Sequence, residues 1–475
     1  MAEEIKNEVP GTSRRDFIKT GTLATAGFMI VPRFVLGGKG FIAPSDRLMI
    51  ASVGVGGKGA DDTSRFDKTG KAEIAFLCDV DDRRAAGSIK KFPKAKYIKD
   101  WRELLDKESK NFDAVSVSTP DHTHAIVAYS AMQLGKHVYV QKPMAHDIYE
   151  ARLLTEAAKK YKVVTQMGNQ GSSNDGTRQL AEWYDAGIIG DVDTVYCWTD
   201  RPVWPQGIPW PTTKTPVPKE LDWDLWLGTA PQKDYVDNLI PFNWRGWWDY
   251  GTGALGDMGC HIMEAPFRVL GLQYVKDVQA SVGSVYVGEF KRGVFPDSCP
   301  PSSHITLTFP KTKKTKGDIT VHWMDGGIQP ERPAELGANE KFGDDGNGIL
   351  FIGKKGKMMA STYSLDPLLL PTSRTKEVTV KQEYKRIPGQ SDGHYGQWVD
   401  ACLAGYGKME VSSPFETAGP LTEALLMANL AVRGHELKGG HVKLEWDNTN
   451  TRVTNFDAVN QYVKREYRKG WELKA

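Results

Sequence analysis

Residues 48–59 read Leu-Met-Ile-Ala-Ser-Val-Gly-Val-Gly-Gly-Lys-Gly, an apolar run that ends in a glycine-rich turn. The spacing G-x-G-x-x-G permits a tight turn, a close approach of backbone to a pyrophosphate and close packing of the next helix. A second apolar run, residues 72–78, is followed by Asp79, whose carboxylate would bind a ribose 2′-hydroxyl. The pattern predicts a dinucleotide-binding unit rather than a glycine-rich surface turn. The expected cofactor contacts are Gly54, Gly56, Gly57, Gly59 and Asp79.

Helices and strands alternate downstream of Asp79. The pattern predicts helices at 82–91, 101–107, 124–134 and 148–161, and strands at 114–119, 137–141 and 163–167. Strands separated by helices of this length pair in parallel through right-handed crossovers. We therefore expect residues 46–168 to form a doubly wound, NAD-binding Rossmann domain.

The pattern changes after Gly168, where strand-like runs follow one another with few helices between them. The runs cover residues 192–198, 275–287, 303–309, 318–323 and 348–352. Such a succession is typical of a mostly antiparallel sheet. We expect residues 169–475 to form an α+β domain that ends with helices near 395–404 and 416–436.

Tryptophan is concentrated early in this second part of the chain. Eight of the fourteen tryptophans lie between Trp198 and Trp248, interleaved with prolines. Rigid aromatic loops of this kind suit a carbohydrate, which stacks on rings and forms hydrogen bonds at its edge. A loop cluster that only packs over the sheet explains any single tryptophan equally well, and the sequence leaves both interpretations open.

The composition excludes several classes of partner and site. A chain of 475 residues predicts two domains, and a net charge of +2 with interspersed signs gives no field that would attract nucleic acid. The five cysteines are scattered and odd in number, and none has Cys-x-x-Cys spacing, so we expect buried thiols rather than disulfides or a zinc site.

The N-terminus resembles an export signal. Residues 13–19, Ser-Arg-Arg-Asp-Phe-Ile-Lys, precede the weakly apolar stretch 20–36, as in a twin-arginine signal. Pro32 and Arg33 interrupt that stretch, so no stable membrane span is expected. We expect residues 1–45 to be a signal and leader that direct the protein to the periplasm or outside the cell, tethered to the membrane if uncleaved. A disordered basic tail is the alternative.

Three residues are candidates for catalysis. Lys142 follows the strand 137–141, and ligands of parallel sheets bind at the carboxyl ends of strands, so its ammonium would stabilise an alkoxide. Asp257 and His261 are four residues apart on a predicted helix that runs to Leu270, so they share a face and could act as orienting acid and base. A helix cap beside a packed histidine, or two metal ligands, are the other interpretations; no further ligand is evident, so no metal is expected.

These motifs, together with Ser118-Thr-Pro-Asp-His-Thr-His124, resemble those of the glucose-fructose oxidoreductase, inositol dehydrogenase and rhizopine-catabolism family, Gfo/Idh/MocA. The resemblance covers roughly residues 46–435 and implies a Rossmann domain followed by an open-faced sheet that often forms a homo-oligomer. It also implies hydride transfer between a nicotinamide cofactor and a hydroxyl of a sugar, glycoside or cyclitol. The positions that it implicates are Lys142, Asp257 and His261 in catalysis, Pro120, His122 and Gln141 near the cofactor, and Asn169 and Gln170 beside the pocket.

The chain departs from the family pattern at Gln141, where the family commonly has glutamate. An amide keeps the hydrogen-bonding reach but loses the charge, which puts the protonation of Lys142 in doubt. Pro266 also removes one helical N–H and is expected to kink the helix that carries His261.

Three functions remain in competition. The first is an exported NAD-dependent oxidoreductase, and the second is a redox-assisted glycosidase with tightly bound NAD that oxidises, eliminates, adds water and reduces with no net oxidation. A non-catalytic sugar sensor is disfavoured by the three candidate catalytic residues. Asp79 favours NAD, whereas Arg83 and Arg84 leave NADP open.

Overall fold

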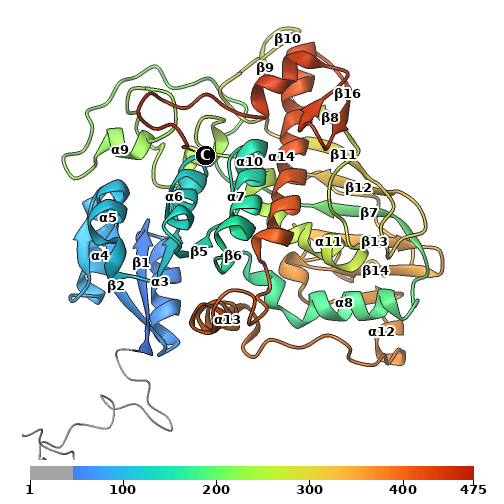
Figure 1. Cartoon of the computed structure of the whole chain (residues 1–475). Helices are drawn as coiled ribbons and strands as arrows, with labels where there is room; N and C mark the ends of the chain where they lie inside the picture. Colours follow the sequence, from blue (N-terminus) through green and yellow to red (C-terminus); the bar gives the residue numbers. More distant parts are fainter. Residues whose placement is uncertain (1–45, 475) are drawn as a thin grey trace, which may run out of the picture. The chain divides into compact units, whose positions relative to one another are not determined.

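The computed structural model describes residues 46–474, and Arg47 begins a single compact unit. The expected export signal and leader, residues 1–45, lie outside the described residues. Figure 1 shows a parallel sheet and a larger mixed sheet with helices packed between them. This arrangement confirms the expected fold class.

The parallel sheet has six strands in the order β3-β2-β1-β4-β5-β6. Its strands are β1 (Leu48–Val53), β2 (Ala72–Cys78), β3 (Lys96–Ile98), β4 (Ala114–Val117), β5 (His137–Val140) and β6 (Thr165–Met167). The chain order reverses between β1 and β4, and ligands of doubly wound sheets bind in the crevice at such a point.

Five helices connect these strands. They are α3 (Lys58–Lys68), α4 (Asp82–Lys91), α5 (Trp101–Glu108), α6 (Asp121–Gln133) and α7 (Ile148–Tyr161). A preceding aspartate caps α4, α5 and α7, because its carboxylate accepts a hydrogen bond from a backbone N–H of the first turn. No side chain caps α3 or α6. The two uncapped helices are the ones that begin at the crevice.

The larger sheet has nine strands in the order β15-β14-β13-β7-β12-β11-β8-β16-β17. Its strands are β7 (Val192–Trp198), β8 (Asp277–Val282), β11 (Ser303–Phe309), β12 (Ile319–Met324), β13 (Gly348–Gly353), β14 (Gly356–Ala360), β15 (Leu368–Leu370), β16 (Lys443–Asp447) and β17 (Arg452–Val453). Only β7 and β12 pair in parallel. A separate two-stranded hairpin joins β9 (Tyr286–Gly288) to β10 (Lys291–Arg292).

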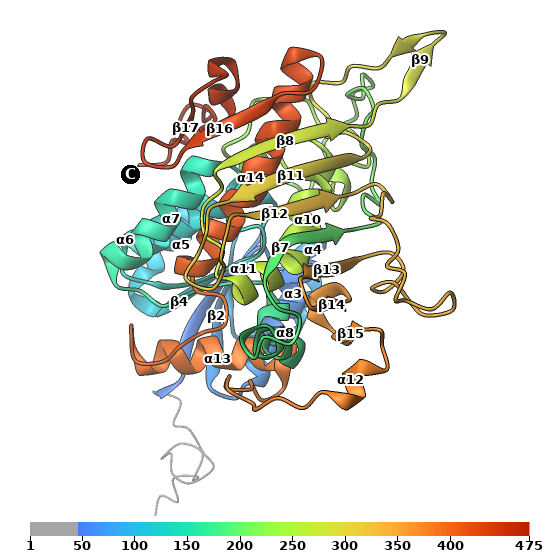
Figure 2. The same cartoon turned by 90° about the vertical axis from the view of Figure 1, so that its right-hand side faces the viewer.

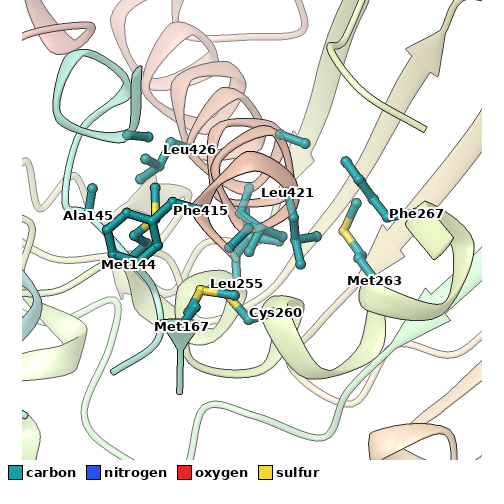
Figure 3. Close-up of a cluster of buried hydrophobic side chains, with 14 of the residues drawn as sticks. Met144, Ala145, Met167, Leu255, Cys260, Met263, Phe267, Phe415, Leu421 and Leu426 are labelled. Carbon is teal, nitrogen blue, oxygen red and sulfur yellow. The ribbon is translucent and has the colours of Figure 1, made fainter. Parts of the chain in front are cut away.

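The helix α14 (Phe415–Lys438) fills the space between the sheets. Figure 2 shows α14 behind the nine-stranded sheet, on the side of α7. Figure 3 shows Leu421 and Leu426 of this helix in one cluster with apolar side chains that include Met144, Leu255 and Met263. Because residues 418–428 of α14 are buried on every side, the apolar residues of this stretch are not confined to one stripe.

A late segment of the chain also completes the parallel sheet. Helix α13 (Gln390–Ala404) places Tyr395 and Trp398 in one core cluster with β1 and with Phe66 of α3. The ring centroids of Phe66 and Trp398 are 5.0 Å apart. One face of the N-terminal sheet is therefore covered by residues that follow it by more than 200 positions.

The expected helix from Gly256 to Leu270 is interrupted. The structure has α10 (Gly253–Ile262) and α11 (Glu264–Leu270), which meet at Met263. Pro266 lacks the N–H that would bond the carbonyl of Ile262, which explains the break. The remaining helices are α8 (Asp175–Asp185), α9 (Trp223–Leu227) and α12 (Arg374–Glu377).

Two further observations concern the described chain as a whole. All five cysteines are buried and unpaired, as the sequence predicts. Within residues 46–474, no helix combines the length and hydropathy that a bilayer crossing requires.

Candidate active site

A cavity of about 400 Å³ opens at the carboxyl ends of β1, β2, β4 and β5. The helix α10 and the tryptophan-rich loop of residues 199–250 form its opposite wall. Of the expected site residues, those that line it are Gly54, Gly56, Gly57, Asp79, Pro120, Gln141, Lys142, Gln170, Asp257 and His261. The sequence therefore identified both ends of one cavity.

The glycine loop is shaped by contacts that a side chain would block. Gly54 has φ +77°, and a Cβ there would lie 2.6 Å from the carbonyl oxygen of Ser118. A Cβ on Gly59 would lie 1.7 Å from the carbonyl oxygen of Gly54, so α3 packs directly on the loop. The uncapped start of α3 leaves backbone N–H groups for an anion. These residues fit the pyrophosphate of a dinucleotide.

Asp79 lies at the expected ribose position. Its carboxylate accepts hydrogen bonds from the backbone N–H of Val55 at 2.9 Å and of Asp81 at 3.1 Å. Burial raises its pKa, and these hydrogen bonds oppose the rise. Arg83 is engaged with Asp81 at 2.7 Å, whereas Arg84 lies against the glycine loop and lines the cavity.

Lys142 and Asp257 form an ion pair at the other end of the cavity. The ammonium of Lys142 donates to the carboxylate of Asp257 at 2.9 Å and to its backbone carbonyl at 2.7 Å. Arg245 donates from Nε to the same carboxylate oxygen at 3.1 Å. Burial alone would raise the pKa of Asp257, but the two cations hold it below its usual range. Asp257 therefore remains ionised and fixes the head of Lys142.

His261 has a different partner from the one expected. Its Nδ1 lies 2.9 Å from Oδ1 of Asn169, and Nδ2 of Asn169 donates to the carbonyl of Cys260 at 2.8 Å. No hydrogen bond joins His261 to Asp257, although both are described, because the two cations hold the carboxylate. The expectation that Asp257 orients His261 is wrong, and Asn169 holds the ring.

The environment of His261 favours the neutral ring. Burial lowers its pKa well below 6.5, and the nearby cation of Lys142 lowers it further. The ring of Tyr363 packs edge-on against it, with centroids 4.6 Å apart. The site therefore holds His261 as a neutral imidazole.

His122 does not line the cavity. It lies beneath the site, where its two ring nitrogens face the carbonyls of Trp226 at 3.0 Å and Tyr250 at 3.3 Å. Burial lowers its pKa to about 3, so the ring is neutral and bridges α6 to the tryptophan-rich loop. The motif position predicted proximity to the cavity but not the direction of the side chain.

Gln141 is held by an acid that the sequence analysis did not identify. Its Nε2 donates to Asp62 of α3 at 2.8 Å, and Ser118 donates to the same oxygen at 2.9 Å. The other oxygen of Asp62 accepts from Tyr395 at 2.8 Å and lies 2.9 Å from the ammonium of Lys58. Asp62 is fully buried, so a carboxylate at position 141 would meet a second one without a donor between them.

The tryptophan-rich loop mostly packs on itself. Trp223, Trp226, Trp244 and Trp247 belong to a separate core cluster, and only Trp226 and Trp244 of these also line the cavity. Both interpretations of the tryptophans therefore apply. Most of them pack into a core within the loop, and two present their indoles to the cavity.

The loop is tied to the Rossmann domain. The backbone N–H of Asp222 donates to Val80 at 2.9 Å, and the N–H of Asp82 donates to Glu220 at 3.1 Å. Arg468, near the C-terminus, donates to the carbonyl of Gly228 at 2.9 Å and to that of Asp224 at 2.7 Å. The cavity is therefore bounded on one side by a loop that is hydrogen-bonded both to the Rossmann domain and to the C-terminal segment.

No group of three or more potential metal ligands is found within residues 46–474. The pair Asp257 and His261 is engaged with protein partners instead.

Family models match two segments of the chain. Residues 48–169 match the NAD-binding Rossmann fold of an oxidoreductase family, and residues 194–286 match the C-terminal alpha/beta domain of the same family. The parallel sheet is thus an NAD-binding Rossmann fold.

The curated relatives are similar over part of their length. A levoglucosan dehydrogenase of Pseudarthrobacter phenanthrenivorans is 22% identical over 41% of this chain and 42% of its own length. An inositol 2-dehydrogenase of Salmonella paratyphi B is 30% identical over 29% and 41%. A glycosyl hydrolase family 109 protein of Shewanella pealeana is 29% identical over 31% and 37%. The chain thus matches less than half the length of these relatives.

Solved structures share the fold over a larger part of the chain. The WlbA dehydrogenase of Bordetella pertussis, in complex with NADH and UDP-GlcNAcA, has a TM-score of 0.55 at 15% identity and covers 84% of this chain and 100% of its own. An inositol dehydrogenase homolog of Azotobacter vinelandii, with NADH and myo-inositol, has a TM-score of 0.53 at 14% identity and covers 84% and 98%.

The contact between Asp62 and Gln141 predicts the outcome of exchanging the two groups. Gln141→Glu should lower stability by about 1–3 kcal/mol, since two carboxylates would then share a buried site. Combining it with Asp62→Asn should restore most of that loss, because the new amide donates to the new acid. Thermal unfolding of the three variants measures this, with Asp61→Asn, an exposed neighbour in the same helix, as the control. Equal stability of the single and double variants would contradict the assignment.

Proposed function

We propose that the chain is an oxidoreductase of the Gfo/Idh/MocA family, and that it transfers hydride between a nicotinamide cofactor and a hydroxyl of a sugar, glycoside or cyclitol. The observation that carries this proposal is the arrangement of the cavity. A dinucleotide cradle lies at one end, and Lys142, Asp257 and His261 meet at the other. The similarity to levoglucosan and inositol dehydrogenases supports this substrate class.

The chain's own residues then divide the work on the substrate hydroxyl. Because Asn169 presents its oxygen to Nδ1, that nitrogen carries the proton and Nε2 of His261 is left as an acceptor. His261 takes the hydroxyl proton, and Lys142 donates a hydrogen bond to the oxygen as negative charge develops. Asp257 holds Lys142 in position. The bound nicotinamide supplies the hydride acceptor.

A second candidate function uses the same residues. In a redox-assisted glycosidase the glycoside would be oxidised, cleaved by elimination, hydrated and reduced with no net consumption of cofactor. The similarity to a glycosyl hydrolase family 109 protein favours it, as does the anchored loop that bounds the cavity. Incubation with glycosides, following both the redox state of the cofactor and the released sugar, separates the two, because only the glycosidase releases sugar without net reduction of the cofactor.

We also propose that the protein is exported with its cofactor already bound. The motivation is the twin-arginine pattern at Arg14 and Arg15, since that route carries folded proteins and free NAD is scarce outside the cytoplasm. The proposal includes assembly as a homo-oligomer through the half-exposed face of the nine-stranded sheet, which carries polar side chains such as His304 and His322.

Removal of the catalytic groups should lower turnover without releasing the cofactor. His261→Ala should reduce kcat by about 10²–10⁴, the size of a general-base contribution, and Lys142→Met should act similarly. Steady-state kinetics with a turned-over glycoside and a cofactor titration of each variant measure the two effects. Near-native turnover of either variant at every pH would contradict the division of roles.

The pH dependence should reveal the influence of Lys142 on His261. Since the folded-state pKa of His261 is lowered, the ring stays neutral as pH falls through 6.5, and its protonation slows the reaction only at lower pH. Lys142→Met removes a cation, so the pKa of His261 rises and the acidic limb of kcat/KM moves to higher pH. Lys99→Met, at the far end of the cavity, is the control and should leave the limb in place. An acidic limb of kcat/KM with an apparent pKa near 6.5 in the wild type would contradict the lowered pKa of His261.

The cofactor end should discriminate against a 2′-phosphate. The carboxylate of Asp79 should repel it, so NAD should bind about 10- to 100-fold more tightly than NADP. Residual NADP binding should depend on Arg84, because Arg83 is engaged by Asp81. Titrations of wild type, Arg84→Ala and Arg83→Ala measure this, and tighter binding of NADP by the wild type would overturn the assignment.

Retention of the cofactor should depend on the anchor at Arg468. Protein from the exported fraction should carry close to one nicotinamide per chain through dialysis, and Arg468→Ala should speed release by about tenfold, since charged hydrogen bonds to the loop are lost. Arg452→Ala, an exposed arginine of the same C-terminal segment, is the control. Protein that emerges empty would end the retention proposal and leave an ordinary dehydrogenase.

A further inference from the structure

Arg245 is a built-in cation beside the proposed catalytic lysine. It belongs to the short 3-10 helix η5 (Asn243–Gly246) and lines the same cavity as Lys142. Its Nε donates to Oδ1 of Asp257 at 3.1 Å, and that oxygen also accepts from Lys142 at 2.9 Å. Because the two cationic heads bond one oxygen, they lie close to each other at the same end of the cavity.

The guanidinium of Arg245 is held rigidly. It stacks on the rings of Trp244 and Phe242, with 4.4 and 4.7 Å between its Cζ and the ring centroids. Its Nη1 donates to the carbonyl of Phe242 at 3.2 Å. A Cβ on Gly251 would lie 2.6 Å from the backbone of Arg245, so the loop is packed closely on that side. Such a guanidinium loses little conformational freedom when it binds a ligand.

One nitrogen of this guanidinium, Nη2, has no protein acceptor among the described residues. In the part of the chain that the structure describes, Nε and Nη1 have partners, whereas no acceptor bonds Nη2. The side chain is 23% exposed, and Nη2 together with the second N–H of Nη1 offers a planar pair of donors that matches a carboxylate. A neutral hydroxyl would use one donor of this pair, and a carboxylate would use both.

The other charged groups near this end are already paired. Lys58 is bonded to Asp61 and Asp62. The buried carboxyl of Asp121 accepts from Thr252 at 2.7 Å, and burial raises its pKa, which weakens it as a counter-charge. With His261 neutral, Asp257 alone directly faces two cations. An additional negative charge is therefore favoured at this end of the cavity.

We propose that Arg245 binds a carboxylate carried by the substrate itself, on a carbon close to the one whose hydroxyl meets Lys142 and His261. The substrate class is then a uronic acid or a glycoside of one, rather than a neutral sugar. This inference rests on the proposed hydride transfer, which concerns the hydroxyl, and adds the group that selects the substrate.

The test compares acids with neutral forms of the same sugars. The holoenzyme is assayed with methyl glycosides of glucuronic, galacturonic and mannuronic acid, each beside its methyl ester. At least one acid should exceed its ester in kcat/KM by about 10- to 100-fold, the range of a charge-assisted hydrogen bond. The preference should weaken with added salt.

A variant series assigns the preference to Arg245. Arg245→Met should bring acid and ester to within about threefold of each other, and Arg245→Lys should keep part of the preference, because a point charge remains without the planar pair. The ratio of acid to ester removes any effect of these changes on Asp257 that both substrates share. Quenching of tryptophan fluorescence by the acid in His261→Ala measures binding without turnover, with Trp244 as a neighbouring reporter.

The outcomes distinguish the inference from the proposed function. Esters or neutral glycosides that react as well as the acids, an acid preference that survives Arg245→Met, or no binding of any acid would overturn the carboxylate assignment and leave the oxidoreductase in place. Failure of every acid and every neutral glycoside to reduce the cofactor, or to be cleaved, would count against the proposed function instead.

Discussion

The close contact between Gly59 and the carbonyl of Gly54 is the constraint on which the site depends. Since no Cβ separates them, α3 begins directly against the glycine loop. The buried Asp62 then lies one turn into this helix, four residues after its first residue, Lys58. That carboxylate collects hydrogen bonds from the ends of β4 and β5 and from α13. The cofactor cradle and the strand that carries the proposed catalytic lysine are thus parts of one rigid network.

The same network explains how the chain tolerates Gln141. In the family pattern an acid follows β5, whereas here the acid comes from α3 and the amide after β5 donates to it. A second carboxylate at position 141 would face the buried Asp62 with no donor between them. The acidic neighbour of Lys142 is Asp257, which accepts a hydrogen bond from its ammonium at 2.9 Å.

Most of the fold could be predicted from the sequence because hydrophobic periodicity is local. The boundaries of α4, α7, β7 and β11 agree with the expected ones, and the break near Pro266 follows from one missing N–H. The short strands β14 to β17 and the docking of α13 depend on contacts between distant segments, which periodicity does not encode. In the site, the spacing placed Asp257 and His261 on one helix. It did not reveal that Lys142 and Arg245 bond the carboxylate of Asp257 in place of His261, nor that His122 points into the protein interior.

That competition determines the electrostatics of the site. Asp257, placed between two cations, stays ionised and holds both, while His261 is left to a neutral partner, Asn169. Burial beside a cation disfavours a protonated imidazole, so Nε2 of His261 can accept a proton. The positive charge at this end of the cavity comes from Lys142 and Arg245. In the proposed reaction, a proton leaving a hydroxyl would move to a neutral base, while the oxygen it leaves would gain negative charge beside these cations. The cations would favour that oxyanion and oppose the imidazolium, and the balance between these two effects would set the barrier to proton transfer.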